Sequence, residues 1–226
     1  MIKTSLLKFY FITFILSISL YSVGNTENEF PLDQAITYGK LENGFTYYIR
    51  ENQTPKDKVS IKLIIKAGSI MEDENQLGLA HLLEHMAFNG SKNFPKRKID
   101  EYMSSIGLNI GSHYNASVGF LKTNYVYEIP TNNDDDVEVA LKILTDISKN
   151  LSLEPEAFER ERKIVEEEWR TDIGGSKNYI NEFHKVMFKN SRFNERKPIG
   201  TLDIIQNFEY QDAIDYYKKW YRPQLM

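Results

Sequence analysis

Two histidines one helical turn apart, with a glutamate between them, constrain this chain more than any other feature. They are His81 and His85, and Glu84 directly precedes the second of them. At 100° per residue, the three side chains fall within about 100° of one helix face. The other positions of residues 77–88 are mostly apolar, and such a helix is normally buried. Because buried imidazole and carboxylate groups are costly unless they are paired or bind an ion, the pattern predicts a metal site.

A third metal ligand must come from elsewhere, and the chain contains no cysteine to supply it. Metal sites in hydrolases that use two histidines usually add a carboxylate and leave a fourth position open. Residues 155–172 predict a helix with proline at its first position, and Glu161 and Glu168 fall about 20° apart on its apolar face. That face carries Ala157, Phe158, Ile164, Val165 and Trp169. We expect Glu166 and Glu167 to point to solvent, and we interpret Glu168 as the ligand and Glu161 as its supporting neighbour.

Six short motifs occur in a fixed order: HLLEHMAFNGSKNFP (residues 81–95), NAS (115–117), TNY (123–125), ERERKIVEEEWR (159–170), KPIG (197–200) and WYRP (220–223). Together they resemble the amino-terminal domain of the pitrilysin-type zinc peptidases, known as family M16, and within it the exported bacterial PqqL-like members. The resemblance extends from about residue 33 to the last residue. It implies one Zn²⁺ held by His81, His85 and Glu168, with Glu84 as the general base and Glu161 as a supporting acidic residue.

The function that this resemblance implies is zinc-dependent endopeptidase activity on unfolded peptides or small proteins. Zinc in such a site activates a water molecule, and Glu84 takes the proton of that water and returns it to the leaving amine. Asn115 and Ala116 lie on a segment that resembles the substrate-binding edge strand of the family, where a peptide adds as a further strand. Asn115 also fits an ordinary turn or edge position, and Glu84 also fits a third ligand or a salt-bridge partner.

The rest of the chain alternates strand and helix patterns typical of an α+β fold, with helices packed on one face of a largely antiparallel sheet. The predicted strands are residues 36–41, 45–50, 59–67, 109–118 and 121–129, with a hairpin at Asn43–Gly44. The predicted helices are residues 77–88, 96–106, 137–150, 155–172, 179–189 and 209–220. The acidic run 132–136 is interpreted as a surface connection. Residues 25–226 are therefore expected to form one domain with a single core.

The first 24 residues have the pattern of a secretory signal peptide. A short basic start precedes an apolar stretch of fifteen residues, FYFITFILSISLYSV, and small residues stand at the −3 and −1 positions before residue 25. This pattern predicts export, with the bacterial periplasm as the location. The alternative is an uncleaved anchor that holds the domain on the membrane, facing the periplasm, because the apolar stretch is long for a signal peptide.

Composition and motif content bear on other classes of function. A net charge of −4 without a basic stripe argues against a nucleic-acid partner. The absence of cysteine excludes the S-ribosylhomocysteine lyase type, which shares the histidine–glutamate pattern but needs a cysteine at its metal. A pair of core histidines beside an unrelated glutamate is a rare coincidence with only four histidines in 226 residues. A non-catalytic peptide-binding subunit is the main alternative, although such family members are expected to lose the pattern that this chain retains.

The resemblance also predicts partners. Family members close a chamber from two such halves, and the second half supplies arginine and tyrosine groups that hold the substrate carbonyl. The resemblance further implies one more strand after Met226. We therefore expect peptide substrates and a second M16 half, which belongs either to the same longer chain or to a separate subunit. Without it, the chain is expected to be an inactive or peptide-binding half.

Overall fold

The computed structural model describes residues 31–172 and 176–226. The chain divides into two compact units, Met1–Ile36 and Thr37–Met226, and the second carries the whole of the predicted site. The predicted signal peptide or anchor, residues 1–24, lies outside the described residues. Among the helices that the structure describes, none is both long and apolar enough to cross a membrane.

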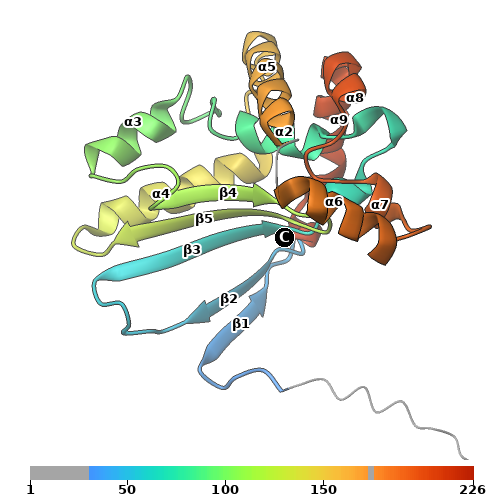
Figure 1. Ribbon diagram of the computed structural model, residues 1–226. Coiled ribbons are helices and arrows are strands. Elements are labelled where there is room, and N and C mark those ends of the chain that lie inside the picture. Colours follow the sequence, from blue (N-terminus) through green and yellow to red (C-terminus); the bar gives the residue numbers. More distant parts are fainter. Residues whose placement is uncertain (1–30, 173–175) are drawn as a thin grey trace, which may run out of the picture. The chain divides into compact units, whose positions relative to one another are not determined.

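Five strands form two separate sheets (Figure 1). The first is a hairpin of β1 (Ile36–Lys40) and β2 (Thr46–Arg50). The second has the order β3-β5-β4, with β3 at Lys58–Ile65, β5 at Thr123–Pro130 and β4 at Tyr114–Val118. Both of its strand pairs are antiparallel, so β5 is central and β4 is an edge. The predicted antiparallel pairing is confirmed, but the hairpin and the main sheet are separate rather than one sheet.

Alternation along β5 explains why one face of this sheet is covered. Thr123, Tyr125, Tyr127 and Ile129 are buried, whereas the residues between them are only half-buried. Since neighbouring side chains on a strand point to opposite faces, one face of β5 packs into the core. Helix α4 (Asp134–Lys149) lies against β5 and β3, and α2 (Leu79–Met86) lies against β4. The predicted α+β architecture, with helices on one face of an antiparallel sheet, is confirmed.

The remaining helices that the structure describes all follow α2 in the chain (Figure 1). Helix α2 packs against both α5 and α9, and α8 packs against α5. Their bounds are α3 Lys98–Ser105, α5 Pro155–Asp172, α6 Ser176–Met187, α7 Arg192–Glu195, α8 Leu202–Asn207 and α9 Tyr210–Trp220, and short 3₁₀ turns lie at Ser69–Met71, Glu74–Gln76 and Pro223–Leu225. The short helices α7 and α8 and the 3₁₀ turns were not predicted from the sequence.

The acidic run after β5 is a helix start rather than a connection. Helix α4 begins at Asp134, and the side chain of Asn133 accepts a hydrogen bond from the main-chain N–H of Asp135. Asparagine is a favoured residue at this capping position, and carboxylates in the first turn interact well with the positive end of the helix dipole. The prediction of a surface connection at residues 132–136 was therefore wrong for residues 134–136, which belong to α4.

The last residues of the chain lie between the two sheets. The main-chain N–H of Thr46, at the start of β2, donates to the carbonyl of Met226 at 3.2 Å. The N–H of Lys66, directly after β3, donates to the carbonyl of Leu225 at 2.7 Å. The further strand expected after Met226 stays a prediction.

Candidate metal centre

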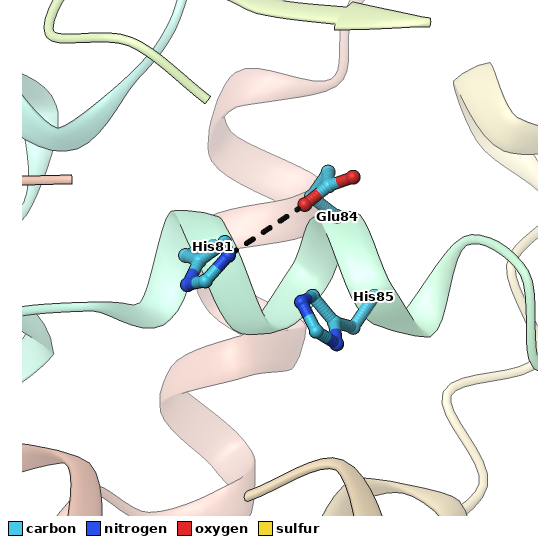
Figure 2. Close-up of side chains that lie close together, drawn as sticks. All are labelled: His81, Glu84 and His85. Atoms are coloured by element: carbon cyan, nitrogen blue, oxygen red, sulfur yellow. Dashed lines mark ion pairs between the residues drawn. The ribbon is translucent and has the colours of Figure 1, made fainter. Parts of the chain in front are cut away.

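Helix α2 brings the three residues of the sequence pattern together. Gly78 precedes it with a positive φ of 98°, and the helix then buries its apolar side chains in the core. Figure 2 shows His81, Glu84 and His85 projecting from neighbouring turns, and their ligand atoms lie within 4.8 Å of one another. The two imidazole rings meet edge to face with their centroids 4.8 Å apart. The prediction that these side chains converge on one side of the helix is confirmed.

Glu168 joins this cluster from helix α5. Its Oε2 atom lies 3.6 Å from Nε2 of His81 and 3.5 Å from Nε2 of His85. Ligands at about 2.0–2.1 Å from a tetrahedral zinc ion are about 3.3–3.4 Å apart, so both of these distances are close to the spacing within a zinc ligand set. Oε2 of Glu84 lies farther away, at 3.9 Å from Nε2 of His81. Two imidazole nitrogens and one carboxylate oxygen are a donor set that suits zinc, and the geometry favours Glu168 over Glu84 as its third member.

Glu161 contacts the outer nitrogen of one histidine. Its Oε2 atom lies 3.3 Å from Nδ1 of His85, and its side chain is almost fully buried. Since a carboxylate can only accept, a ring N–H is at Nδ1, and Nε2 is the ring nitrogen that faces Glu168. Burial opposes ionisation of Glu161, but hydrogen bonds from His85 and Asn89 and the nearby charges of His85 and Arg160 together outweigh it and hold the pKa of Glu161 below its usual value. Asn89 steadies the same turn by donating to the carbonyl of His85 at 3.2 Å.

Burial sets the protonation of the cluster. It lowers the pKa of His81 to about 4, with a further contribution from the nearby His85, so His81 is neutral at pH 7 and can offer a lone pair. Burial also raises the pKa of Glu84 to about 7; His85 opposes this rise and Glu168 adds to it. For His85, burial is outweighed by the neighbouring carboxylates, above all Glu161, which raise its pKa. The cluster thus contains a neutral imidazole and a carboxyl group that exchanges a proton near neutral pH.

The exposure of the α5 side chains corrects part of the sequence analysis. Glu167 is exposed as expected, at 67%, but Glu166 is only 17% exposed because it accepts hydrogen bonds from Gln206 of α8 and from Arg170. Glu168, expected to be buried, is 44% exposed because it lies at the rim of a cleft. Ile164, placed on the buried face, is 41% exposed. The prediction that Glu161 is buried is confirmed.

A cleft of about 470 Å³ opens beside the cluster. It is lined by His81, Glu84, Ala116, Ser117, Val118, Glu168, Thr171, Pro198 and Ile199. Ala116, one of the two predicted substrate contacts, lines this cleft, whereas the exposed Asn115 is not among the lining residues. Thr171, Pro198 and Ile199 were not predicted as site residues. The sequence signal for Pro198 and Ile199 was the KPIG motif at residues 197–200, which the resemblance contained without assigning it a role, whereas Thr171 lies just after the motif at residues 159–170 and had no such signal.

These features define a class of protein: a metallopeptidase-type domain, in which one helix presents two histidines and a glutamate to a carboxylate on a second helix, beside the edge strand of an antiparallel sheet. Comparison with known families agrees. Residues 47–197 match the model of the insulinase family, peptidase family M16. The chain belongs to this family.

Individual relatives show the same relationship. The chain is 37% identical over 217 residues to a probable zinc protease PqqL of Haemophilus influenzae, and the match covers 94% of this chain and 23% of that protein. It is also similar to the crystal structure of the periplasmic protease PqqL from Escherichia coli, with 32% identity, a TM-score of 0.84, and coverage of 87% of this chain and 22% of that one. Against the crystal structure of the first half of the same protease, the chain covers 42%. The chain thus spans less than a quarter of the length of the PqqL proteins it matches.

Proposed function

We propose that this chain is the zinc-binding domain of a metalloendopeptidase. The observation that carries the proposal is the position of Oε2 of Glu168, nearly equidistant from the Nε2 atoms of His81 and His85. Membership of family M16 and similarity to proteins named zinc proteases support it. In this proposal, His81, His85 and Glu168 hold one Zn²⁺, Glu84 is the general base, and Glu161 orients His85.

The chain's own residues divide the chemistry among them. A zinc ion, when bound, supplies Lewis acidity that lowers the pKa of a water ligand towards about 7. Glu84 lies in the cleft beside the proposed ligands, where its carboxylate accepts the proton of the attacking water and passes it to the leaving amine nitrogen. Its pKa of about 7 suits both steps, because a group with a pKa near the working pH can both accept and release a proton. Glu161 keeps His85 in one tautomer by accepting from Nδ1.

The edge strand β4 is the proposed binding site for the substrate main chain. Along Asn115–Val118, β5 is the strand that pairs with it within the described part of the chain, so the other edge of these residues offers N–H and C=O groups. An extended peptide that adds to this edge passes the cleft containing Glu84. Main-chain pairing does not depend on side chains, which suits unfolded peptides of varied sequence. Asn115 and Ala116 are proposed substrate contacts on this strand.

We also propose that the active unit includes a second M16 half. The Escherichia coli relative has a structure described as its first half, of which this chain covers 42%. The same relative is described as periplasmic, which supports export to the periplasm for this chain as well. Signal-peptide cleavage and membrane anchoring concern residues 1–24, and sequencing the amino terminus of the exported protein tests which of the two occurs. The alternative function, a non-catalytic peptide-binding half, is disfavoured because every residue of the proposed catalytic set is present.

The test is the Glu84→Gln variant, assayed in the chain combined with a second M16 half. The amide keeps the shape of the side chain but cannot accept a proton, so peptide cleavage should fall by about 10²–10⁴-fold. Zinc content should stay at one per chain. Glu101→Gln on α3 is the matched control, because that glutamate is 59% exposed and pairs with Lys98 away from the cleft. Near-normal cleavage by Glu84→Gln would remove this residue from the mechanism.

A further inference from the structure

A buried carboxylate outside the metal cluster caps the helix that carries it. Glu72 is 0% exposed. Its Oε1 accepts from the main-chain N–H of Ala80 at 2.9 Å, and its Oε2 accepts from the N–H of Gly78 at 3.1 Å. The first N–H groups of a helix have no partner within the helix, so this side chain satisfies two donors at the start of α2. Burial raises the pKa of Glu72 to about 8, and the two main-chain donors act in the opposite direction.

The main chain of Glu72 is itself fixed by two arginines. Its carbonyl accepts from Nη2 of Arg192 at 2.6 Å and from Nε of Arg196 at 3.0 Å. Arg196 is 3% exposed and also pairs with the carboxylate of Glu74. The hydroxyl of Ser69 donates to the carbonyl of Arg196 at 2.6 Å, so the segment before Glu72 is also bonded to the main chain of Arg196. The capping carboxylate is therefore held in place from outside the helix that it caps.

The segment after Arg196 packs directly against the same helix start. A Cβ atom on Gly200 would lie 2.4 Å from the carbonyl oxygen of Leu77, so only glycine allows this approach. A Cβ atom on Gly78 would lie 3.0 Å from the carbonyl of Ile199, a residue of the cleft wall. The start of α2 is thus enclosed by Glu72 on one side and by the cleft wall on another.

The two histidines differ in what orients their rings. Nδ1 of His85 meets Glu161, but Nδ1 of His81 is buried and has no hydrogen-bond partner among the described residues. Metal-binding histidines usually donate their outer N–H to a carboxylate or carbonyl that fixes the ring. Since His81 lacks such a partner, the position of its ring depends on the main chain of the first turn of α2. That turn begins at Leu79, and Glu72 holds the N–H of Ala80, the residue directly before His81.

We propose that Glu72 is a positioning residue for the metal centre: by capping α2 through Gly78 and Ala80, it fixes the first turn of the helix and with it Nε2 of His81. This proposal rests on the proposed zinc site. Glu72 does not touch the ion or the substrate, and it acts through the helix main chain. Glu161 orients the His85 ring by a direct hydrogen bond, whereas Glu72 positions His81 indirectly.

The test compares Glu72→Gln with Glu74→Gln in the whole chain. A glutamine at position 72 has one oxygen to accept with, and its NH₂ group then faces the other main-chain donor, so the first turn must shift. Glu74→Gln makes the same change from a carboxyl group to an amide in a side chain that is 84% exposed, and it removes the pair with Arg196. Zinc affinity, measured by competition with a chelator, should fall by about 10–100-fold in Glu72→Gln, as for other partners that orient metal ligands, and by less than about twofold in Glu74→Gln.

Cobalt substitution separates positioning from simple loss of stability. The visible absorption bands of Co²⁺ report the geometry of its ligands, and they should change in fully loaded Glu72→Gln but not in Glu74→Gln. Equal zinc affinity and identical cobalt spectra for the two variants would overturn the proposal. If wild-type protein failed to bind zinc, the proposed function would fail instead. Should Glu72→Gln not fold, amide hydrogen exchange of the wild type decides: the N–H groups of Gly78 and Ala80 should be protected like the interior of α2, and rapid exchange at both refutes the cap.

Discussion

Replacing Glu168 by glutamine tests the assignment of the third ligand most directly. The amide is a neutral and weaker donor, and the carboxylate oxygen that lies 3.5–3.6 Å from both Nε2 atoms is lost. Structural zinc sites bind with about 10–16 kcal/mol through four ligands, or about 2.5–4 kcal/mol for each. At about 1.4 kcal/mol for each factor of ten, the zinc dissociation constant should rise by about 10²–10³-fold.

Two neighbours on the same helix provide graded controls. Glu161→Gln removes the partner of His85 but no ligand, so the zinc dissociation constant should rise by about 10–100-fold. Glu167→Gln changes a side chain that is 67% exposed and pairs with Arg170, and zinc affinity should stay within about twofold of the wild type.

The assay is equilibrium competition with a chromophoric chelator at pH 7, with circular dichroism to establish that each variant is folded. The expected order of zinc affinity is Glu167→Gln above Glu161→Gln above Glu168→Gln. Equal affinity for Glu168→Gln and Glu167→Gln would refute the ligand assignment. A larger loss in Glu161→Gln than in Glu168→Gln would instead indicate that Glu161 binds the ion.

Two further predictions concern stability and activity. Asp146 is buried and accepts hydrogen bonds from Ser91, from both the main chain and the side chain of Asn93, and from Asn150. Burial alone would raise its pKa, but these donors lower it below the usual 3.8, so the carboxylate stabilises the fold above about pH 4 and loses that effect as the pH falls further. Asp146→Asn should cost about 2–3 kcal/mol at pH 7 and less near pH 3 in urea unfolding, and an equal cost at both pH values would contradict this. Separately, the chain alone should cleave an unstructured peptide poorly. A second M16 half added in trans should raise the cleavage rate at least about a hundredfold, which is what one hydrogen-bond donor to the oxyanion contributes. Full activity of the isolated chain would show that no such donor is missing.

The parts of the fold that could be predicted are those with a strong local period. Helix α5 spans Pro155–Asp172, as the sequence predicts, because proline marks its start and the apolar face repeats over five turns. The three strands β3, β4 and β5 were also predicted, although β4 begins at Tyr114 rather than at residue 109. The start of α2 was placed two residues early, because Leu77 continues the apolar pattern whereas Gly78 adopts a left-handed conformation that a helix cannot include.

Contacts between distant segments could not be predicted from these patterns. A helical wheel gives the direction of Glu166, but its burial depends on Gln206, which lies on a short helix with no clear sequence signal. In the same way, Pro198 and Ile199 reach the cleft through a tertiary contact between Gly78 and Gly200, residues more than a hundred positions apart. Glu72 has no periodic pattern to mark it, since it lies in a short connection before the helix that it caps.

The partial exposure of Glu168 also changes the reason for which it was identified. The sequence argument treated it as a carboxylate buried on an apolar face, where only a cation could offset the cost. At 44% exposure that cost is much smaller, and the two imidazoles already lie within 3.6 Å of its Oε2. A hydrolytic site needs this arrangement, because three donors from α2 and α5 must leave a fourth side open to water and substrate. Glu161, nearly fully buried behind His85, is the carboxylate to which the burial argument applies, and it is the one that the structure places away from the cleft lining. Depth therefore separates the two glutamates in the proposed site: the more exposed Glu168 lines the cleft as the proposed ligand, and the buried Glu161 is proposed to orient His85 from behind.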